Sequence, residues 1–195
     1  FYSPSDVIVD VRFLETLSTR DINAGLAEVV KCGFIADPSI LSDLEKSLHV
    51  TASLIHKAIS VKAKVVSADF KESYGREVLN YGHTLGHAIE KDSKFRLRHG
   101  EAVSIGMVFA AELSNELVGL SKEVVDLHRV LSSNFKLPIS YPKSRWKLLS
   151  ALLLKDKKVK QGKVRFIGIS KIGKPVWLED VPSNTLARVY ERITK

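Results

Sequence analysis

Apolar residues recur at helical spacing along most of the chain. This spacing predicts helices over residues 24–35, 39–48, 51–69, 102–117, 121–133, 144–154 and 183–193. Asp21 is the expected N-cap of the first helix, and Asp37-Pro38 is expected to end it. Two short runs, 163–169 and 176–178, are joined through Ile172-Gly173 and predict a hairpin. The pattern therefore predicts one mainly α-helical domain with a small β-hairpin.

Residues 102–117 are apolar on nearly every face, which is typical of a helix buried on all sides. Val7-Ile8-Val9-Asp10-Val11 is a short β-branched run. It predicts a strand, which we expect to be the last strand of a preceding part of the polypeptide. The chain begins with Phe1, and its only methionine is Met107. We therefore expect the chain to be part of a larger polypeptide.

Composition narrows the class of protein. With 195 residues, of which 45% are hydrophobic, the chain can bury a sizeable core in one or two domains. The longest apolar stretch, 102–113, is interrupted by Ser104, Gly106 and Glu112, so we expect no membrane span. The single cysteine, Cys32, excludes an internal disulfide and a cysteine-rich zinc site, which suits a reducing cytoplasm. Any bound metal must use His, Asp and Glu.

The formal net charge of +8 raises the question of nucleic-acid binding. Much of the basic excess lies between Lys155 and Lys174, where Phe166 is the only aromatic residue among the charges. We interpret this segment as a solvated basic hairpin and expect no nucleic-acid partner. A sharper alternative is that one or two of these lysines reach a small anionic substrate.

Three of the six histidines fall within seventeen residues, in the segment 80–90 and in His99-Gly100-Glu101. His83 and His87, at i and i+4, project from one face of a helix and can converge on one ion. The spacing resembles the zinc-protease motif His-Glu-x-x-His. However, Thr84 follows His83, so the carboxylate that activates water in a protease is missing. The cluster therefore indicates a metal site and argues against a peptidase.

A catalytic zinc usually has three protein ligands. His99, expected on a loop before the buried helix, is one further candidate, and Glu28 is another because it lies in an otherwise apolar run. A buried, unpaired carboxylate is costly, and coordination of a cation removes that cost. The alternative is a surface pair between Glu28 and Lys31 at i and i+3. The other histidines have no further candidate ligands near them in the sequence and are expected at the surface: His49, His56 and His128.

Lys62 is expected at the centre of an apolar stripe of the helix at 51–69. The apolar residues of this stripe are Ile55, Ala58, Ile59, Val65 and Val66. A lysine there must either extend its ammonium to water or meet an anion, and Asp69 is a candidate partner. Arg76 and Asn80 come just before the histidines, so cations would surround the metal. This combination suits a polyhydroxylated substrate that bears carboxylate and phosphate groups.

Four segments together resemble the 3-dehydroquinate synthase family of sugar-phosphate cyclases. They are residues 25–31, 79–90, 99–103 and Asp156-Lys157-Lys158, and their order and spacing agree over essentially the whole chain. The resemblance covers the later part of the enzyme and implies its multihelical C-terminal domain. Residues 1–12 would then be the last strand of an upstream nucleotide-binding domain, and 13–195 the metal- and substrate-binding domain.

The resemblance also implies site roles. Glu28, His83 and His99 match the metal ligands, normally of zinc, which cobalt can replace. His87 matches a histidine that faces the substrate. Further matches are substrate contacts at Lys31, Lys62, Arg76, Asn80 and Lys157, with Lys158 as the alternative to Lys157, and a segment that touches NAD, Phe13-Leu14-Glu15-Thr16.

The reaction implied by the resemblance converts 3-deoxy-arabino-heptulosonate 7-phosphate to 3-dehydroquinate and phosphate in the shikimate pathway. NAD is regenerated within the cycle. The resemblance implies a homodimer, and we expect residues 1–195 alone to be inactive because the main NAD site would lie upstream. Four alternatives stay open: a cyclase of the inosose or valiolone type, a metal-dependent polyol dehydrogenase, a basic nucleic-acid-binding module, and a purely structural metal site.

Overall fold

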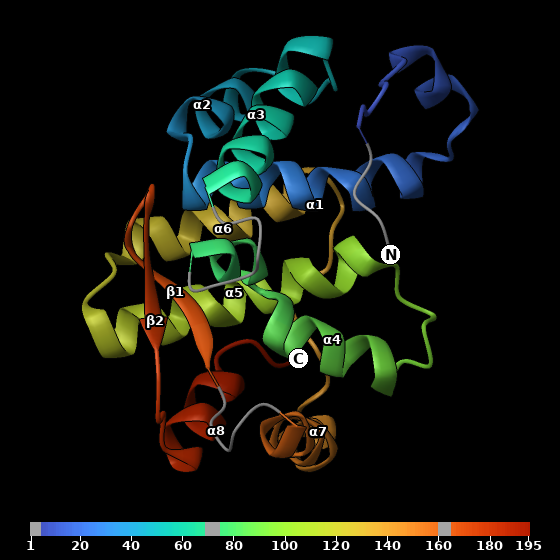
Figure 1. Ribbon diagram of the computed structural model, residues 1–195. Coiled ribbons are helices and arrows are strands. Elements are labelled where there is room, and N and C mark those ends of the chain that lie inside the picture. Colours follow the sequence, from blue (N-terminus) through green and yellow to red (C-terminus); the bar gives the residue numbers. More distant parts are fainter. Residues whose placement is uncertain (1–4, 69–74, 160–164) are drawn as a thin grey trace.

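A computed structural model describes residues 5–68, 75–159 and 165–195, with the backbone alone at 155–159. The chain is mainly helical with one two-stranded antiparallel hairpin, which confirms the expected fold class. Helix α5 (His99–Val118) runs through the centre of the molecule, and the other elements lie around it (Figure 1). None of the helices in the described ranges is long and apolar enough to cross a membrane.

Helix α5 is apolar on nearly every face because it borders two groups of buried side chains. Val103, Met107 and Ala111 pack with residues of α1 (Thr19–Ile35), α2 (Pro38–Lys46) and α6 (Lys122–Asn134). The other side of the helix contributes to a second group. Its α5 members are Ala102, Ile105, Val108, Phe109 and Leu113, and they pack with residues of α4 (His83–Asp92), α7 (Trp146–Val159) and α8 (Ser183–Glu191).

Two glycines let α5 approach its neighbours closely. A Cβ at Gly100 would overlap with the backbone carbonyl of Ala24 in α1. A Cβ at Gly106 would overlap with the carbonyl of Gly82, the residue before α4. Because side chains are absent at these points, α1 and the start of α4 pack backbone to backbone on the same helix.

Local capping explains where the first helices begin. The side chain of Ser18, not Asp21, caps α1 by accepting a hydrogen bond from the Asp21 amide at 3.2 Å, so the helix starts earlier than expected. Asp37 accepts from the Ser39 amide at 3.0 Å and starts α2, with Pro38 in its first turn. Helix α3 (Ala52–Ala68) follows.

The apolar stripe expected on α3 is wrong in detail. The buried residues of this helix are Leu54 and Val61, whereas Ile59 is 43% exposed and Lys62 is also exposed. Ala58 of the expected stripe does pack against the core, so the buried face of α3 overlaps with that stripe but is not centred on Lys62. Lys62 is therefore not enclosed by apolar side chains.

The hairpin is confirmed, with β1 (Phe166–Lys171) paired to β2 (Lys174–Leu178). It packs on α5, where the Ser114 hydroxyl accepts a hydrogen bond from the Ile169 amide at 3.1 Å. Two short 3-10 helices, η2 (Gly75–Asn80) and η3 (Lys143–Arg145), precede α4 and α7.

The strand expected at residues 7–11 does not form. Residues 6–10 pair with no other strand among the described residues, and Val11–Thr16 form the 3-10 helix η1. A strand exists only through hydrogen bonds to a neighbour, and the sequence pattern does not supply one. Val7 and Ile8 are strongly exposed. The assignment of residues 1–12 to an upstream domain stays a prediction.

His128 is buried, which corrects the expectation that it lies at the surface. Its ring stacks on Phe34 with ring centroids 3.4 Å apart. Its Nδ1–H donates to the Val124 carbonyl at 2.7 Å, and its Nε2 accepts from the Tyr81 hydroxyl at 2.9 Å. Both ring nitrogens are thus satisfied, which the sequence spacing could not reveal. His49 and His56 are exposed, as expected.

Candidate metal centre and substrate pocket

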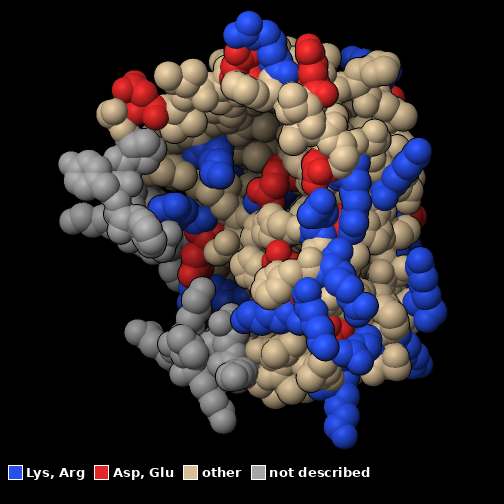
Figure 2. All heavy atoms as spheres, turned by 90° about the vertical axis from the view of Figure 1, so that its right-hand side faces the viewer, with Lys and Arg blue, Asp and Glu red and all other residues tan. Residues whose placement is uncertain are grey.

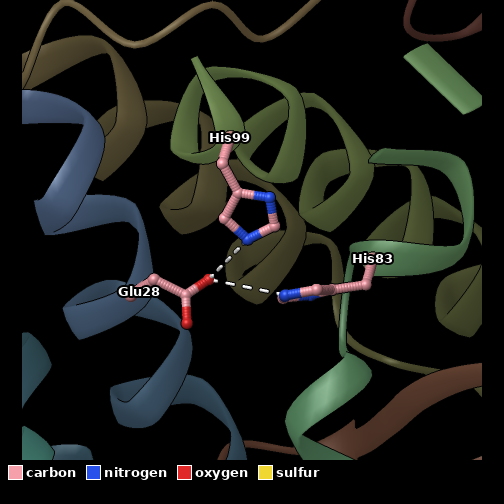
Figure 3. Close-up of side chains that lie close together, drawn as sticks. All are labelled: Glu28, His83 and His99. Carbon is pink, nitrogen blue, oxygen red and sulfur yellow. Dashed lines mark ion pairs between the residues drawn. The ribbon is translucent and has the colours of Figure 1, made fainter. Parts of the chain in front are cut away.

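One carboxylate oxygen of Glu28 lies between two histidines (Figure 3). Its Oε1 is 3.6 Å from Nε2 of His83 and 3.6 Å from Nε2 of His99. The three side chains come from α1 and from the first residues of α4 and α5. His99 therefore lies within α5 and not on the loop before it, which corrects the sequence prediction.

This arrangement fits a zinc ion. Two ligands that are each about 2.0–2.1 Å from a tetrahedral zinc lie ~3.3–3.4 Å apart, close to the separations found here. The two observed distances of 3.6 Å are too long for hydrogen bonds. Oε1 of Glu28 is buried and has no hydrogen-bond partner in the described part of the chain. A buried acceptor without a partner, facing two histidine nitrogens, matches the donor set that zinc prefers.

The second oxygen of Glu28 has a separate partner. Its Oε2 accepts from Nζ of Lys31 at 2.7 Å, and Lys31 is buried. Burial by itself would raise the pKa of the Glu28 carboxyl, but Lys31, with smaller contributions from His83 and His99, holds that pKa below its usual value. The two interpretations of Glu28 are therefore compatible, since one oxygen pairs with lysine and the other faces the histidines.

A backbone hydrogen bond holds the ring of His83 in one tautomer. Its Nδ1–H donates to the Tyr81 carbonyl at 3.1 Å, which leaves the lone pair of Nε2 directed at Glu28. Burial, together with the positive charge of Lys31, lowers the pKa of His83 to about 4. The ring is thus neutral near pH 7, as a ligand must be.

The start of α5, which carries His99, is fastened to α1. The Glu101 carboxylate accepts from the Arg98 amide at 2.8 Å and pairs with Arg20 of α1 at 2.6 Å. Together with the close approach at Gly100, these contacts fix His99 relative to Glu28.

His87 lies beside this centre but is exposed. Its ring centroid is 5.3 Å from that of His83 and 6.0 Å from that of His99. Nitrogen and oxygen atoms of His87, Glu90 and His99 also lie within 4.8 Å of one another. The i, i+4 spacing thus brings His83 and His87 together, while the carboxylate of Glu28 reaches His83 and His99.

Glu90 has a contact that the sequence predictions did not include. Its Oε1 is 3.2 Å from Nδ1 of His99, and its side chain is 14% exposed. The available signal was the spacing of His83, His87 and Glu90 at i, i+4 and i+7, which puts all three on one face of a helix.

A pocket of about 540 Å³ opens beside the three candidate ligands. The expected substrate contacts that line it are Lys31, Lys62, Arg76 and Asn80. Figure 2 shows a hollow whose walls carry both acidic and basic side chains. Lys62 reaches the pocket from an exposed position on α3, so burial is not the reason for its place there. Asp69, its suggested partner, lies outside the described residues.

Glu77 holds the pocket segment η2 against the hairpin. Its Oε2 accepts from Arg165 at 2.8 Å and from the Trp177 indole at 3.1 Å. Arg76 and Asn80 lie on the same short helix, so this anchor positions both ends of η2 at the pocket. Partners that lie about a hundred residues away gave no signal in the sequence.

Two groups of expected site residues are not brought to the pocket. Phe13–Thr16 lie in η1, and none of them lines the pocket; Phe13 is 72% exposed. Their contact with NAD stays a prediction. The side chains of Lys157 and Lys158 lie outside the described part of the structure, as does much of the basic segment.

Comparison with solved structures gives the class of fold. A 2-epi-5-epi-valiolone synthase of Streptomyces hygroscopicus subsp. jinggangensis, solved with NAD+ and Zn2+ bound, matches with a TM-score of 0.83 at 23% identity, over 94% of this chain and 54% of that one. A 2-deoxy-scyllo-inosose synthase matches with a TM-score of 0.80 at 26% identity, over 98% of this chain and 56% of that one. The fold is that of the sugar-phosphate cyclases.

Comparison of sequences is more specific. A family model described as 3-dehydroquinate synthase C-terminal matches residues 25–159. The 3-dehydroquinate synthase of Paenarthrobacter aurescens is 45% identical over 99% of this chain and 55% of its own length. That of Mycolicibacterium vanbaalenii is 42% identical over all of this chain and 56% of its own length. The chain belongs to the 3-dehydroquinate synthase family, and it spans about half the length of these curated relatives.

Proposed function

We propose that this chain is the metal- and substrate-binding part of a 3-dehydroquinate synthase, a lyase of the shikimate pathway. The substrate would be 3-deoxy-arabino-heptulosonate 7-phosphate, and the products 3-dehydroquinate and phosphate. The observation that carries the proposal is the unpartnered Oε1 of Glu28, which faces His83 and His99 at the edge of a cation-lined pocket.

Glu28, His83 and His99 would hold the zinc, and His87 would lie beside it. When bound, the metal lowers the pKa of a substrate hydroxyl and polarises the ketone formed by its oxidation. NAD, when bound, would supply the reversible redox chemistry of the cycle without net consumption. Phe13–Thr16 are the residues proposed to touch NAD from this chain.

The chain's own side chains would bind and orient the substrate. Lys62 and Arg76 supply positive charge for a carboxylate and a phosphate, and Asn80 supplies an amide for hydroxyl groups. Lys31 neutralises one oxygen of Glu28, so the carboxylate stays ionised beside the neutral His83. Lys157 is proposed as a further substrate contact.

His87 is proposed to move a proton at the substrate. It is exposed and lies one helical turn from His83, so it can reach a bound molecule without replacing a ligand. An imidazole can accept a proton and, once protonated, give it back near pH 7, which suits the elimination of phosphate and the later ring closure.

Related cyclases are the nearest alternative. The structural neighbours named valiolone and inosose synthases are 23% and 26% identical to this chain, whereas curated 3-dehydroquinate synthases reach 46%. The difference in identity favours the dehydroquinate reaction. A polyol dehydrogenase would stop after oxidation and release NADH.

Further proposals concern the setting of the domain. An upstream nucleotide-binding domain of the same polypeptide would complete the NAD site, and the protein would act as a homodimer in the cytoplasm. The relatives' greater length supports a polypeptide with a further part. We expect the protein not to bind nucleic acid.

The test is phosphate release from the heptulosonate phosphate by the full-length polypeptide, with and without NAD and with a chelator. We expect release that requires both NAD and metal, with no net NADH. Parallel assays with the phosphorylated sugars from which inosose and valiolone synthases build their rings test those two reactions. Turnover of either one in place of the heptulosonate phosphate, or NADH without phosphate, would contradict the proposal.

A further inference from the structure

We propose that Glu90 is a positioning residue for the metal centre. It would orient His99 by accepting a hydrogen bond from Nδ1–H and so direct Nε2 towards Glu28 and the ion. The inference rests on the zinc site of the proposed function and adds to it a residue outside the expected ligand set.

Each ring nitrogen of His99 faces a different carboxylate, which supports this role. Nδ1 lies 3.2 Å from Oε1 of Glu90, while Nε2 lies 3.6 Å from Oε1 of Glu28. An ionised carboxylate can only accept, so the proton of the neutral ring belongs on Nδ1. The lone pair on Nε2 then points to the position between Glu28 and His83, where the ligand atoms converge.

His99 needs such a partner more than His83 does. His83 is 12% exposed and is oriented by the Tyr81 carbonyl of the rigid backbone just before α4. His99 is 46% exposed, so packing restricts its ring less. Glu90 is 14% exposed, and its position on α4, one turn after His87, holds it against the start of α5. The two histidines would thus be oriented by different acceptors, a carbonyl and a carboxylate.

A competing interpretation uses the same side chains. His87, Glu90 and His99 offer atoms within 4.8 Å of one another, so Glu90 could itself be a ligand. The two arrangements differ in which residues the metal needs. A positioning role requires Glu28 and His83 and tolerates the loss of His87, whereas a ligand role requires His87 and tolerates the loss of Glu28.

The test uses the full-length polypeptide with Glu90→Ala, Glu90→Gln and, as a matched charge control, Glu45→Gln on the exposed surface of α2. Zinc dissociation constants come from competition with a chromophoric chelator. We expect Glu90→Ala to weaken zinc binding about 10- to 100-fold, as removal of such partners does elsewhere. Glu90→Gln, whose amide oxygen can still accept from Nδ1–H, should recover part of the affinity.

A second readout needs no metal. Nitrogen chemical shifts of His99 in the metal-free protein report which ring nitrogen carries the proton. We expect the Nδ1–H form in the wild type and in Glu90→Gln, and a shift towards Nε2–H in Glu90→Ala. A purely structural contribution of Glu90 would leave this distribution unchanged. If Glu90→Ala does not fold, the comparison of Glu90→Gln with Glu45→Gln provides the affinity measurement.

Several results would overturn the proposal. One is zinc affinity of Glu90→Ala within about twofold of the control. Another is a requirement for His87 together with retained zinc in Glu28→Gln, which would make Glu90 a ligand. A wild type that binds no zinc would overturn both proposals, whereas one that binds zinc but releases no phosphate would overturn the proposed function alone.

Discussion

Gly100 of α5 lies directly against the backbone carbonyl of Ala24 in α1, so closely that a Cβ on Gly100 would overlap with it. Ala24 is one helical turn before Glu28, and Gly100 is the residue after His99. The distance between these two candidate ligands is therefore set where two helix backbones meet.

Substitution Gly100→Ala should push α1 and α5 apart. The overlap is with backbone, which cannot rotate away, so we expect a loss of at least about 1–3 kcal/mol in the free energy of unfolding and weaker zinc binding. The measurement is urea unfolding followed by the fluorescence of Trp146 and Trp177, with zinc titration of the folded fraction.

Gly25→Ala is the matched control on α1. A Cβ at Gly25 would meet nothing within 4 Å, and alanine favours the helix over glycine by ~0.5–1 kcal/mol. We expect this variant to be as stable as the wild type or slightly more stable. Equal stability of Gly100→Ala and Gly25→Ala would show that the two helices adjust more freely than their packing indicates.

Glu28→Gln tests the central ligand. The amide has nearly the same shape, but it lacks the charge that pairs with Lys31 and binds a cation. Zinc affinity should fall by more than about 100-fold, because changes outside the ligand set already cost 10- to 100-fold. Circular dichroism should show that the helices are retained. Retention of one zinc per chain in Glu28→Gln/His99→Ala would contradict the ligand assignment.

His87→Ala should separate metal binding from turnover. The zinc stoichiometry should equal that of the wild type because His87 is not among the three proposed ligands, whereas the rate of phosphate release should fall ~10²- to 10⁴-fold with loss of proton transfer. Metal analysis and the phosphate assay on the same full-length preparation check both points. Loss of zinc together with activity would move His87 into the ligand set.

The buried His128 predicts a pH dependence of stability. Burial lowers its pKa to about 3 in the folded chain, against 6.5 for an exposed histidine. Below pH 6.5 the unfolded chain binds a proton that the folded chain does not, so stability is complete above pH 6.5 and falls as the pH decreases towards 3. At pH 5 the contribution lost is about 2 kcal/mol.

Urea unfolding at pH 7 and pH 5, with chelator present, measures this effect. His128→Gln retains an acceptor for Tyr81 and has no group that titrates, so its loss of stability between the two pH values should be smaller than that of the wild type. His56→Gln, which changes an exposed histidine, should behave as the wild type does. Identical pH dependence in His128→Gln and the wild type would contradict the prediction.

Helical periodicity located most of the elements because the apolar faces of α1, α5 and α6 are long and continuous. It centred the buried face of α3 on Lys62, which is exposed, whereas the buried residues of this helix are Leu54 and Val61. It also predicted a strand at residues 7–11, where the described structure has no pairing partner. The hydrophobic pattern shows which side chains of a segment could be buried, whereas the packing of neighbouring elements determines which of them are buried.

The candidate site was predictable to a similar extent. Histidine density placed it near residues 83–99, and the apolar run around Glu28 made this residue a candidate ligand, which the family resemblance also implied. The structure places its carboxylate against His83 and His99. Glu77 was not identified because its partners are recognisable only after the chain has folded. Glu90 was overlooked although its spacing puts it on the same helix face as His83 and His87. Long-range partners also explain His128, whose ring contacts Phe34 of α1 and Tyr81 of the turn before α4 in addition to Val124 of its own helix.

The close packing of α5 at Gly100 and Gly106 has a thermodynamic consequence. Glu28, His83 and His99 converge only when three helices are in place, so an unfolded chain offers no comparable site. An ion that binds the folded form alone adds its binding free energy to the free energy of unfolding. Each tenfold increase in free zinc above the dissociation constant would then add about 1.4 kcal/mol, so the zinc supply of the cell would help to set the folded fraction of this domain.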